Sequence, residues 1–448
     1  MKRLLQLAMT TALGAGLTTQ LLAQPLPAEV GNKKPNIILI LVDDLGYECM
    51  GANGGESYKT PALDKMAQTG IRFNYCYAQP LCTPSRVQIM TGIYNVRNYR
   101  GWANLDPSQT TFANLLKKAG YVTCMAGKWQ LGDHGIATLP KHFGFDESYL
   151  FPYGSYHWGP SLVLNGRTEE YRPEDYGPDL VSDQACRFIE RNKSKPFFLY
   201  YTEHLPHDPF LPTPDSHAQD VQKYATGKNT LAAMKLSNKK YFRDMVEYMD
   251  KLCGKLMATL DAQGLRENTL VIFTGDNGTG AGVPSVLNGR TVIGGKGEMT
   301  DAGTHVPLIV RWPAGIKKAG VCDDLVDFTD FLPTICEAAG AAIPAELKVD
   351  GRSFLPQLRG EPGHPREWCY CWFSKDGRSK AAEWARNHRY KLYRTGEFYD
   401  VSNDVLEKQP LANLSSEAKE ARILLQQALD RYRDARPAEL LDNVSPAK

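Results

Sequence analysis

The chain has 448 residues, 23% of them charged, and a formal net charge of +2. That length is enough to bury a large core and to form one big domain plus a smaller one. Both signs of charge are mixed and no long run of lysine and arginine occurs, which argues against a nucleic-acid partner.

The N-terminus combines a basic start with a modest apolar stretch. Met1-Lys2-Arg3 is followed by mainly apolar and small residues up to Ala23. This order is typical of a secretory signal peptide over residues 1–23. A membrane anchor is the alternative, but Gln6 and Gln20 weaken it, and no second long apolar run follows. We therefore expect an exported protein, periplasmic or secreted, without a membrane anchor.

Ten cysteines would permit disulfide bonds in an oxidising compartment. Their spacing shows no paired Cys-x-x-Cys pattern of the kind that binds zinc. Cys369 and Cys371 alternate within an aromatic run, so we expect both on one face of a strand. The sequence leaves the pairing of the cysteines open.

Apolar runs alternate with helical patterns along the first 300 residues or so. Runs typical of buried parallel strands occupy residues 36–42, 121–126, 196–201 and 270–274. Helical spacing of apolar residues marks 112–119 and the longer stretch 241–256. The alternation predicts an α/β fold with a mostly parallel central sheet flanked by helices.

Three of the apolar runs end in polar residues. Asp43-Asp44 follows the first, His204 and His207 follow the third, and Asp276-Asn277 follows the last. Ligands of parallel sheets bind outside the carboxyl ends of the strands. Separate solvated turns are the ordinary explanation of such ends, but three of them favour one shared site.

The segment Leu81–Gly92 places a cysteine next to the start of a helix. Thr83 is the expected N-cap and Pro84 the expected first helical residue. Cys82 would then lie at the positive end of the helix, where an anion is favoured. Arg86, one turn in, can bind a tetrahedral oxyanion with its fork of donors.

The string Cys82-Thr83-Pro84-Ser85-Arg86, followed by Thr91-Gly92, resembles the signature of the type I sulfatases, members of the alkaline phosphatase-like superfamily. In that family the cysteine is oxidised after translation to Cα-formylglycine (3-oxoalanine). The resemblance implies that a maturation enzyme converts Cys82 and that one hydroxyl of the hydrated aldehyde attacks sulfur. The second hydroxyl then expels sulfate and regenerates the aldehyde.

The resemblance also implies a metal site. Asp43 and Asp44 match the first metal-binding pair of the family and Asp276 and Asn277 match the second, and the converted Cys82 is implied as a further metal ligand. Carboxylate and amide oxygens are hard ligands, suited to calcium or magnesium and not to zinc. Family precedent favours calcium over magnesium or manganese.

Further catalytic roles follow from the same resemblance. Lys128 lies in Ala126–Trp129 and Lys296 in Gly294–Gly297, and both are implied to contact the sulfate oxygens. His207 matches the histidine near the leaving group, while His204 is expected to be structural or to face the substrate. Asp276 is the candidate acceptor of the nucleophile's proton. The implied catalytic set is Cys82, Arg86, Lys128, His207, Asp276 and Lys296, of which Lys128, His207 and Lys296 also bind the substrate.

One position departs from the family pattern. Gln130 follows Lys128-Trp129, where family members usually have a histidine that helps to deprotonate the nucleophile. Glutamine can hydrogen-bond but cannot move a proton at neutral pH. Slower turnover, replacement by His134, or a subfamily with another base all stay open. His305, where arginine is common, is a smaller departure that we expect to affect only packing.

From about residue 360 the pattern changes to short alternating segments at 368–373, 389–393 and 397–401, followed by a helix at 416–432. A small antiparallel sheet plus a helix resembles the C-terminal subdomain of sulfatases. The predicted organisation is thus a catalytic domain over 33–359 and a C-terminal subdomain over 360–448.

The sequence gives less information about the substrate. Aromatic residues at 151–159 and 99–102 can stack on sugar rings, but packing in buried loops is an equal alternative. Export and the family together favour a sulfated carbohydrate. A formylglycine-dependent phosphonate or phosphodiester hydrolase is the close alternative. A catalytically silent sulfated-glycan binder is the other, with Gln130 as its only supporting feature.

Overall fold

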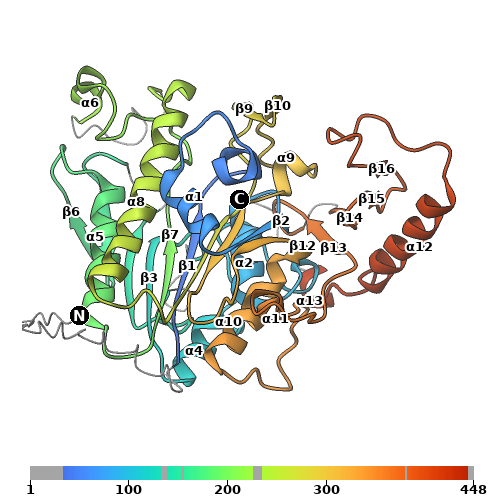
Figure 1. The fold of residues 1–448 in the computed structure, drawn as a ribbon, viewed down its shortest axis with the longest axis horizontal. Helices are drawn as coiled ribbons and strands as arrows, with labels where there is room; N and C mark the ends of the chain where they lie inside the picture. The colour runs from blue at the N-terminus through green and yellow to red at the C-terminus, as the bar shows by residue number, and fades with distance from the viewer. Residues whose placement is uncertain (1–33, 133–138, 153–155, 226–234, 379–380, 442–448) are drawn as a thin grey trace, which may run out of the picture. The chain divides into compact units, whose positions relative to one another are not determined.

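The computed structural model describes residues 34–132, 139–152, 156–225, 235–378 and 381–441. A ten-stranded sheet forms its centre, in the order β12-β2-β11-β8-β1-β7-β3-β4-β5-β6 (Figure 1). Its strands are β1 Asn36–Val42, β2 Ile71–Tyr77, β3 Val122–Lys128, β4 Glu147–Phe151, β5 Ser161–Leu164, β6 Arg167–Glu170, β7 Phe197–Thr202, β8 Thr269–Gly275, β11 Leu308–Arg311 and β12 Gly320–Asp327.

The strands β8, β1, β7, β3 and β4 run parallel to one another in the middle of this sheet. Ile40 of β1 is in register with Phe273 of β8 and Tyr201 of β7, so these three strands end at the same edge. Antiparallel strands lie to either side: β11 between β8 and β2, and β5 and β6 beyond β4. The predicted α/β fold with a mostly parallel sheet is confirmed.

Helices cover both faces of the sheet, as the side chains of β1 show. Ile38, Ile40 and Val42 pack in the core beneath α1 (Pro61–Gln68), α5 (Gly177–Arg191) and α8 (Phe242–Ala262). Ile37, Leu39 and Leu41 belong to the opposite core, with α2 (Cys82–Thr91), α4 (Phe112–Lys118) and α10 (Phe331–Ala339). Because successive side chains of a strand point to opposite faces, an apolar run such as β1 serves two cores at once.

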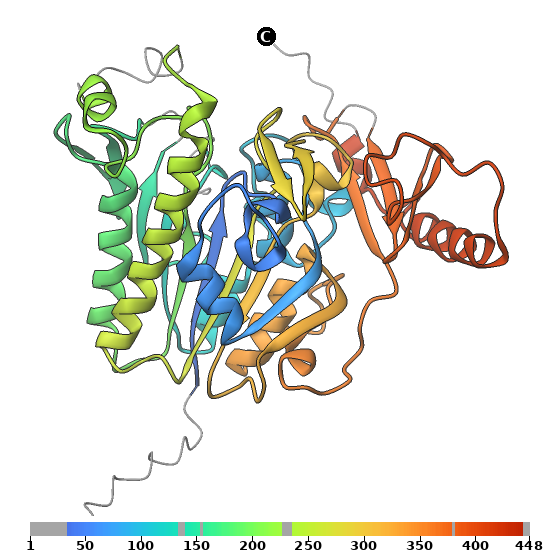
Figure 2. The ribbon, with the colours of Figure 1, turned by 45° about the horizontal axis from the view of Figure 1, so that its top comes forward.

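A four-stranded antiparallel sheet and a long helix follow in the C-terminal part (Figure 2). The strands are β13 Cys369–Phe373, β14 Ala382–Arg386, β15 Tyr390–Tyr393 and β16 Phe398–Asp400, and the helix is α12 Ser416–Arg431. The small sheet and helix agree with the prediction, except that β14 was not predicted. Its sequence, Ala-Glu-Trp-Ala-Arg, has only one large apolar residue, Trp384, which is buried.

Shorter elements lie between these within the described residues. They are η1 Tyr47–Cys49, η2 Gly51–Asn53, α3 Asn95–Asn98, α6 Ala218–Tyr224, η4 Lys239–Tyr241, the hairpin β9 Pro284–Leu287 and β10 Arg290–Ile293, α9 Asp301–Thr304, η5 Phe328–Asp330, α11 Leu355–Leu358 and α13 Ala438–Leu441. Within the described ranges, no helix combines the length and the apolar character needed to cross a bilayer. The proposed signal peptide, residues 1–23, lies outside those ranges.

All ten cysteines carry free thiols, and all but Cys322 are buried. Cys369 and Cys371 share one apolar cluster with Trp384, which agrees with the prediction that they face the same side of a strand. The disulfides that the composition would permit do not form in this structure. Buried thiols of this kind behave as small apolar side chains.

Candidate active site

Three aspartates and one asparagine, which follow the carboxyl ends of the neighbouring strands β1 and β8, define the centre of the site. Asp43 and Asp44 follow β1, and Asp276 and Asn277 follow β8. The backbone N–H of Asp44 donates to Asp276 Oδ1 at 3.2 Å, and Asn277 Nδ2 donates to Asp44 Oδ1 at 2.9 Å. All four side chains are buried. The parallel pairing of the two strands therefore brings together residues that are more than 230 positions apart in the sequence.

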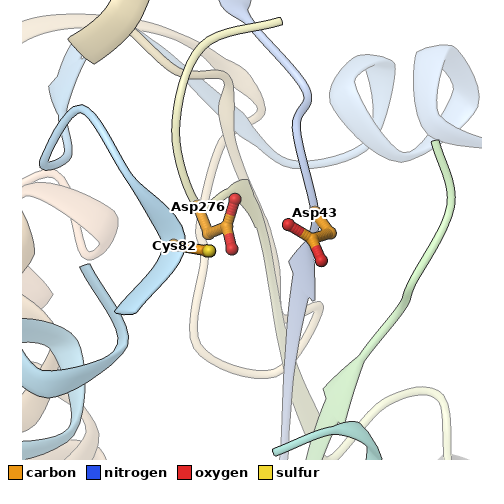
Figure 3. Close-up of side chains that lie close together, drawn as sticks. All are labelled: Asp43, Cys82 and Asp276. Carbon is orange, nitrogen blue, oxygen red and sulfur yellow. The ribbon is translucent and has the colours of Figure 1, made fainter. Parts of the chain in front are cut away.

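Cys82 reaches this centre from the N-terminus of α2. One ligand atom each of Asp43, Cys82 and Asp276 lie within 4.8 Å of one another (Figure 3). Cys82 is 0% exposed, and burial raises the pKa of its thiol although Lys128 opposes the shift. The thiol is thus protonated and shielded in the fold, and it faces the acidic residues.

The start of α2 differs from the prediction. The helix begins at Cys82, with Leu81 in an extended conformation before it and no side-chain cap. The predicted N-cap residue, Thr83, lies inside the first turn, and its hydroxyl has no hydrogen-bond partner. The predicted N-cap was therefore wrong, but Cys82 lies at the positive end of the helix as predicted.

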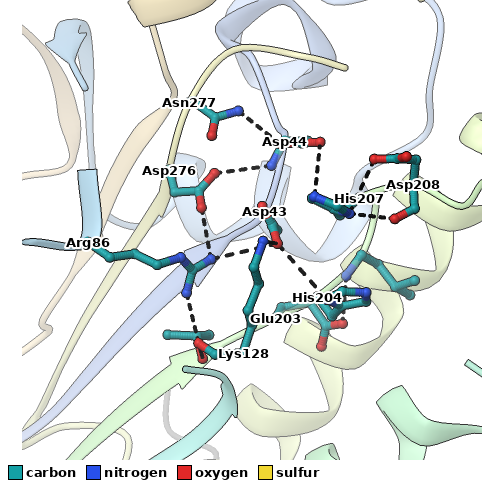
Figure 4. A network of polar contacts seen from close by, with 12 residues as sticks. Asp43, Asp44, Arg86, Lys128, Glu203, His204, His207, Asp208, Asp276 and Asn277 are labelled. Atoms are coloured by element: carbon teal, nitrogen blue, oxygen red, sulfur yellow. Dashed lines mark hydrogen bonds and ion pairs between the residues drawn. The ribbon is translucent and has the colours of Figure 1, made fainter. Parts of the chain in front are cut away.

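Arg86 lies one turn along α2 and points into the same centre (Figure 4). Its Nη2 donates to Asp276 Oδ2 at 2.8 Å and its Nη1 donates to the carbonyl of Lys128 at 2.9 Å. A second carboxylate, Asp43, lies 3.8 Å from Nη2. Burial alone would lower the pKa of Arg86, but Asp276 and Asp43 raise it, so the guanidinium stays charged.

Lys128 and Lys296 bring two further positive charges. Lys128 ends β3, and its Nζ donates to Asp43 Oδ2 at 2.5 Å. Lys296 lies in the segment between β10 and α9, and its Nζ donates to Asp44 Oδ2 at 2.7 Å. Both ammonium groups are therefore fixed by a carboxylate at the same edge of the sheet.

A glycine lets β3 deliver Lys128 to this position. Gly127 has φ +119°, and a Cβ atom there would lie 1.9 Å from the carbonyl oxygen of Thr202 in β7. The hydroxyl of Thr202 also donates to the carbonyl of Lys128 at 2.9 Å. Only glycine allows this close approach of the two strands.

The two central carboxylates differ in their affinity for protons. Burial by itself would raise the pKa of Asp43, but Lys128, His207 and Arg86 hold it well below its ordinary value. Burial and the nearby charge of Asp43 raise the pKa of Asp276 to about 7, although Arg86 opposes them. Neighbouring carboxylates with separated pKa values can divide acid and base roles between them.

Two histidines after β7 complete the polar cluster. His207 Nε2 lies 4.0 Å from Asp44 Oδ2, and His204 Nδ1 lies 4.0 Å from Asp43 Oδ2 (Figure 4). Burial lowers the pKa of both rings, with Lys128 adding to the shift at His207. His204 also stacks on the ring of Phe151, with centroids 4.6 Å apart. The structure thus brings both histidines to the cluster.

The acidic residues fit a hard divalent cation. Asp43 Oδ1 and Asn277 Oδ1 are buried and have no hydrogen-bond partner within the described part of the chain, which is costly unless a cation or water meets them. Three carboxylates and one amide oxygen form a donor set suited to calcium or magnesium. Three buried carboxylates so close together also repel one another, which a cation would relieve.

Gln130, two positions after Lys128 in the sequence, has an unusual backbone conformation. Its φ is +51°, it is 6% exposed, and neither polar atom of its amide has a hydrogen-bond partner among the described residues. The proposed substitute, His134, lies outside the described residues. His305 stacks on Tyr47 with ring centroids 4.2 Å apart, and its Nε2 contacts the carbonyl of Asn74 at 2.9 Å. These are packing contacts of the kind expected for that position.

The sequence analysis missed two buried groups behind His204. Glu203 accepts hydrogen bonds from the hydroxyl of Tyr201 and the N–H of Leu205, and burial raises its pKa to about 7. His157 is 0% exposed, and its ring lies 5.0 Å from that of His204. A carboxylate directly after an apolar strand was the available signal for Glu203, whereas no local pattern marked His157.

The aromatic residues proposed for sugar stacking are mostly inside the protein. Phe151, Tyr156 and Trp158 are buried, and Phe151 is the last residue of β4. Tyr99 is also buried, and Trp102 is 38% exposed. Residues 153–155 lie outside the described part. Of the two alternatives, loop packing therefore accounts for the described residues other than Trp102.

Comparisons with known proteins bear on this geometry. A family model described as Sulfatase matches residues 35–341, and one described as N-sulphoglucosamine sulphohydrolase, C-terminal matches residues 295–435. Human arylsulfatase A is 32% identical over 413 residues, which span 81% of this chain and 75% of the relative. The ulvan-active sulfatase of Formosa agariphila is 29% identical, over 85% of this chain and 70% of the relative.

A solved structure shows the same likeness in three dimensions. The crystal structure of Ps i-CgsB in complex with k-i-k-neocarrahexaose superposes with a TM-score of 0.75 at 26% identity. The match covers 90% of this chain and 94% of that chain.

Proposed function

The chain belongs to the sulfatase family and is a sulfuric ester hydrolase of the arylsulfatase type, and on that premise we propose a more specific activity. The enzyme is exported and hydrolyses sulfate monoesters of a sulfated carbohydrate. It does so through a formylglycine made from Cys82 by a maturation enzyme and with a bound calcium ion. The observation that carries this proposal is the convergence of Cys82, Arg86 and Lys128 on Asp43 and Asp276 in one buried cluster.

Three cations of the chain are placed to hold the sulfate group. Arg86, Lys128 and Lys296 each contact a carboxylate of the cluster, at 2.8, 2.5 and 2.7 Å respectively. Their positions are thus set before a substrate arrives, and preorganised charge stabilises a transition state without reorganisation at the moment of reaction. We assign the sulfate oxygens to these three side chains.

The residues that would hold calcium are Asp43, Asp44, Asp276 and Asn277. When bound there, the ion supplies Lewis-acid polarisation of a sulfate oxygen. The unpaired oxygens Asp43 Oδ1 and Asn277 Oδ1 support this assignment. Magnesium and manganese use similar ligands and are the alternatives.

His207 and Lys296 are placed to assist the departing alcohol. Both lie beside Asp44, His207 at 4.0 Å and Lys296 at 2.7 Å. Burial alone would lower the pKa of Lys296, but Asp44 raises it, so the ammonium keeps its proton. It can therefore donate a hydrogen bond to an oxygen on which negative charge develops.

A carbohydrate substrate is supported by the nature of the relatives. One is an ulvan-active sulfatase, and the structural neighbour is bound to a neocarrahexaose. Export is supported by the basic and apolar N-terminal sequence. We also propose the division into a catalytic domain, 33–359, and a C-terminal subdomain, 360–448.

The two alternatives make different predictions for one panel of substrates. A phosphonate or phosphodiester hydrolase would share the nucleophile and the metal ligands. A silent glycan binder would be expected to have lost some of the cluster, yet Cys82, Arg86, Lys128 and Lys296 are all in place. We therefore favour hydrolysis of a sulfate ester over both.

The test is the mature enzyme on matched sulfate, phosphate and phosphonate aryl esters and on sulfated oligosaccharides. We expect sulfate release to dominate and to disappear in Cys82→Ala. Faster cleavage of the phosphonate or phosphodiester would favour the first alternative. Glycan binding without release from any ester would favour the second.

A further inference from the structure

A cleft of about 630 Å³ is lined in part by α9, the helix that follows the segment carrying Lys296. One wall is the β9–β10 hairpin, the other is the loop 403–408, and Asp301 and Ala302 of α9 lie between them. Figures 1 and 2 both show the hairpin and α9 on the side of the C-terminal sheet. Its volume is within the range of ordinary ligand-binding clefts.

Two positively charged side chains line the cleft without an ion-pair partner among the described residues. Arg290 of the hairpin and Lys408 of the loop are exposed, and neither forms an ion pair with another described residue. Three carboxylates also line the cleft, and each has a hydrogen-bond or ion-pair partner. Asp301 binds Arg386 at 2.5 Å, and Asp404 accepts from the N–H of Gln409 at 2.7 Å. The third, Glu48, is buried and accepts a hydrogen bond from Thr279 at 2.5 Å.

Exposed apolar side chains lie next to these cations. Val405 is 44% exposed and Leu406 53% exposed, and both line the cleft together with Tyr47. An apolar surface beside unpaired cations suits a ligand with apolar ring faces and anionic substituents. A sulfated sugar has both features.

Both walls of the cleft are held by the rest of the protein. The hairpin is tied to the segment 54–57 by hydrogen bonds from Glu56 N to Val286 O and from Asn288 N to Gly54 O, at 2.9 and 3.0 Å. The loop is tied through Glu407, which binds Lys391 Nζ at 2.7 Å. A preformed site loses little entropy when a ligand binds.

The cleft and the active site share one segment of chain. Lys296 contacts Asp44 in the active site, and Asp301, five positions later, lines the cleft. Five residues span at most about 18 Å. A ligand of several sugar units is long enough to span this separation.

We propose that this cleft is a second subsite of the enzyme, which binds another sulfated unit of a polysaccharide substrate through Arg290 and Lys408. The proposal rests on the sulfatase function proposed above and specifies its substrate as a polymer. It concerns affinity for the chain and not the chemistry at sulfur.

The test is a binding measurement with dextran sulfate as the probe. The full chain carries Cys82→Ala, so that turnover does not interfere, and is compared with the same chain carrying Arg290→Ala and Lys408→Ala. A matched control carries Arg422→Ala and Lys419→Ala, which remove two exposed cations from α12 instead. Unchanged unfolding temperatures establish that each variant is folded.

We expect the cleft variant to bind dextran sulfate about tenfold more weakly, with a smaller dependence on salt, and the α12 control to bind as the parent does. Equal affinity of the cleft variant and its parent would overturn the proposal, as would an equal loss in the control. The proposal would also be overturned if polyglutamate bound the parent as tightly and lost as much affinity, because the cleft would then bind acidic peptides. Sulfate release by the mature wild-type enzyme reports on the proposed function separately.

Discussion

Arg86 joins three parts of the active site at a single guanidinium. It spans Asp276 after β8 and the carbonyl of Lys128 at the end of β3, while it belongs to α2 itself. A buried arginine is tolerable here because two carboxylates lie within 3.8 Å. Lysine has the same charge on a single nitrogen without the planar fork, so it cannot reproduce the geometry of contacts made from two separate nitrogens.

We therefore expect Arg86→Lys to lower kcat/KM by about 10²-fold or more, because one preorganised donor is lost at the sulfate site. Steady-state kinetics on a small aryl sulfate measure the effect. The control is Arg97→Lys, which alters a part-buried pair with Asp350 away from the cluster. An Arg86→Lys enzyme within about threefold of wild type would contradict the role given to the fork of donors.

The buried side chain of Gln130 lowers the stability of the fold. A buried amide without partners costs about 1–3 kcal/mol relative to an apolar group of similar shape. Such a cost is expected at a functional position, where a ligand supplies the missing partners. The side chain is thus a candidate substrate contact despite its inability to move a proton.

The substitution Gln130→Met keeps the chain length and removes both polar atoms. We expect thermal stability to be kept or to rise by about 1–2 °C, while kcat/KM falls about tenfold. Thermal unfolding and kinetics of the same preparation check both parts. Gln68→Met on the exposed face of α1 is the control, with no gain in stability. Lower stability with full activity would show that the amide serves only the fold.

At the scale of elements, the C-terminal sheet holds the segment that presents Lys296. Arg386 of β14 binds Asp301 of α9 at 2.5 Å, and Lys391 of β15 donates to the carbonyl of Met299 at 2.6 Å. Two strands of the small sheet thus restrain the chain within five residues of Lys296. We expect these contacts to help to hold Lys296 in position.

The pair Asp301–Arg386 makes this restraint depend on pH. Burial would raise the pKa of Asp301, but Arg386 and Lys391 lower it from 3.8 to about 2. Because the folded-state pKa lies below the unfolded value, the pair stabilises the fold above about pH 4 and loses that effect as the pH falls towards 2.

We expect Asp301→Asn to lower the free energy of unfolding by about 2 kcal/mol at pH 7, with a difference from wild type that narrows below about pH 4. Urea unfolding at several pH values measures it. The control is Asp183→Asn, which removes an exposed ion pair with Lys255 and should cost less than about 1 kcal/mol. A difference that stays constant between pH 7 and pH 3 would contradict the ionic account.

The elements that the sequence predicted well are those with strong local patterns. The apolar run of β1 and the helical spacing of α8 specify their elements without help from distant residues. The strand β14 was missed because neighbours in β13 and β15, not its own apolar content, make it a strand. The cap of α2 was misplaced because its extended residue, Leu81, is set by tertiary packing and not by a capping side chain.

In the molecule as a whole, the active site forms where the ends of several strands lie close together. The motifs at Asp43, Cys82, Lys128 and Asp276 could be named from the sequence, since each carries its own local signal. The contacts between these motifs could not be predicted in the same way, because they depend on the strand order β8-β1-β7-β3, which no local sequence pattern specifies. Three further features could not be predicted either, because packing between distant segments produces them and no local sequence pattern marks them. They are the unpaired amide of Gln130, the burial of His157 and the cleft beside Arg290.

The acidic centre should couple metal binding to the stability of the whole fold. A ligand that binds only the folded chain raises its stability by mass action, by about 2.7 kcal/mol at a hundredfold excess over Kd. We expect calcium to raise the unfolding temperature of chelator-treated protein and to restore sulfate release. Asp276→Asn removes one carboxylate ligand and should reduce the calcium-dependent rise in unfolding temperature. An equal rise in that variant would place the calcium elsewhere.

We infer that Cys82, which is 0% exposed and lies against Asp43 and Asp276, is the precursor of the nucleophile. The measurement that tests it most directly is mass spectrometry of the peptide containing residue 82, on protein produced with a maturation enzyme, alongside sulfate release by the same sample. We predict a formylglycine at residue 82 and sulfate release in proportion to the converted fraction, both absent in Cys82→Ala. Sulfate release at full rate from unconverted protein, or a fully converted protein inert towards a broad panel of sulfated glycans and aryl sulfates, would contradict the account.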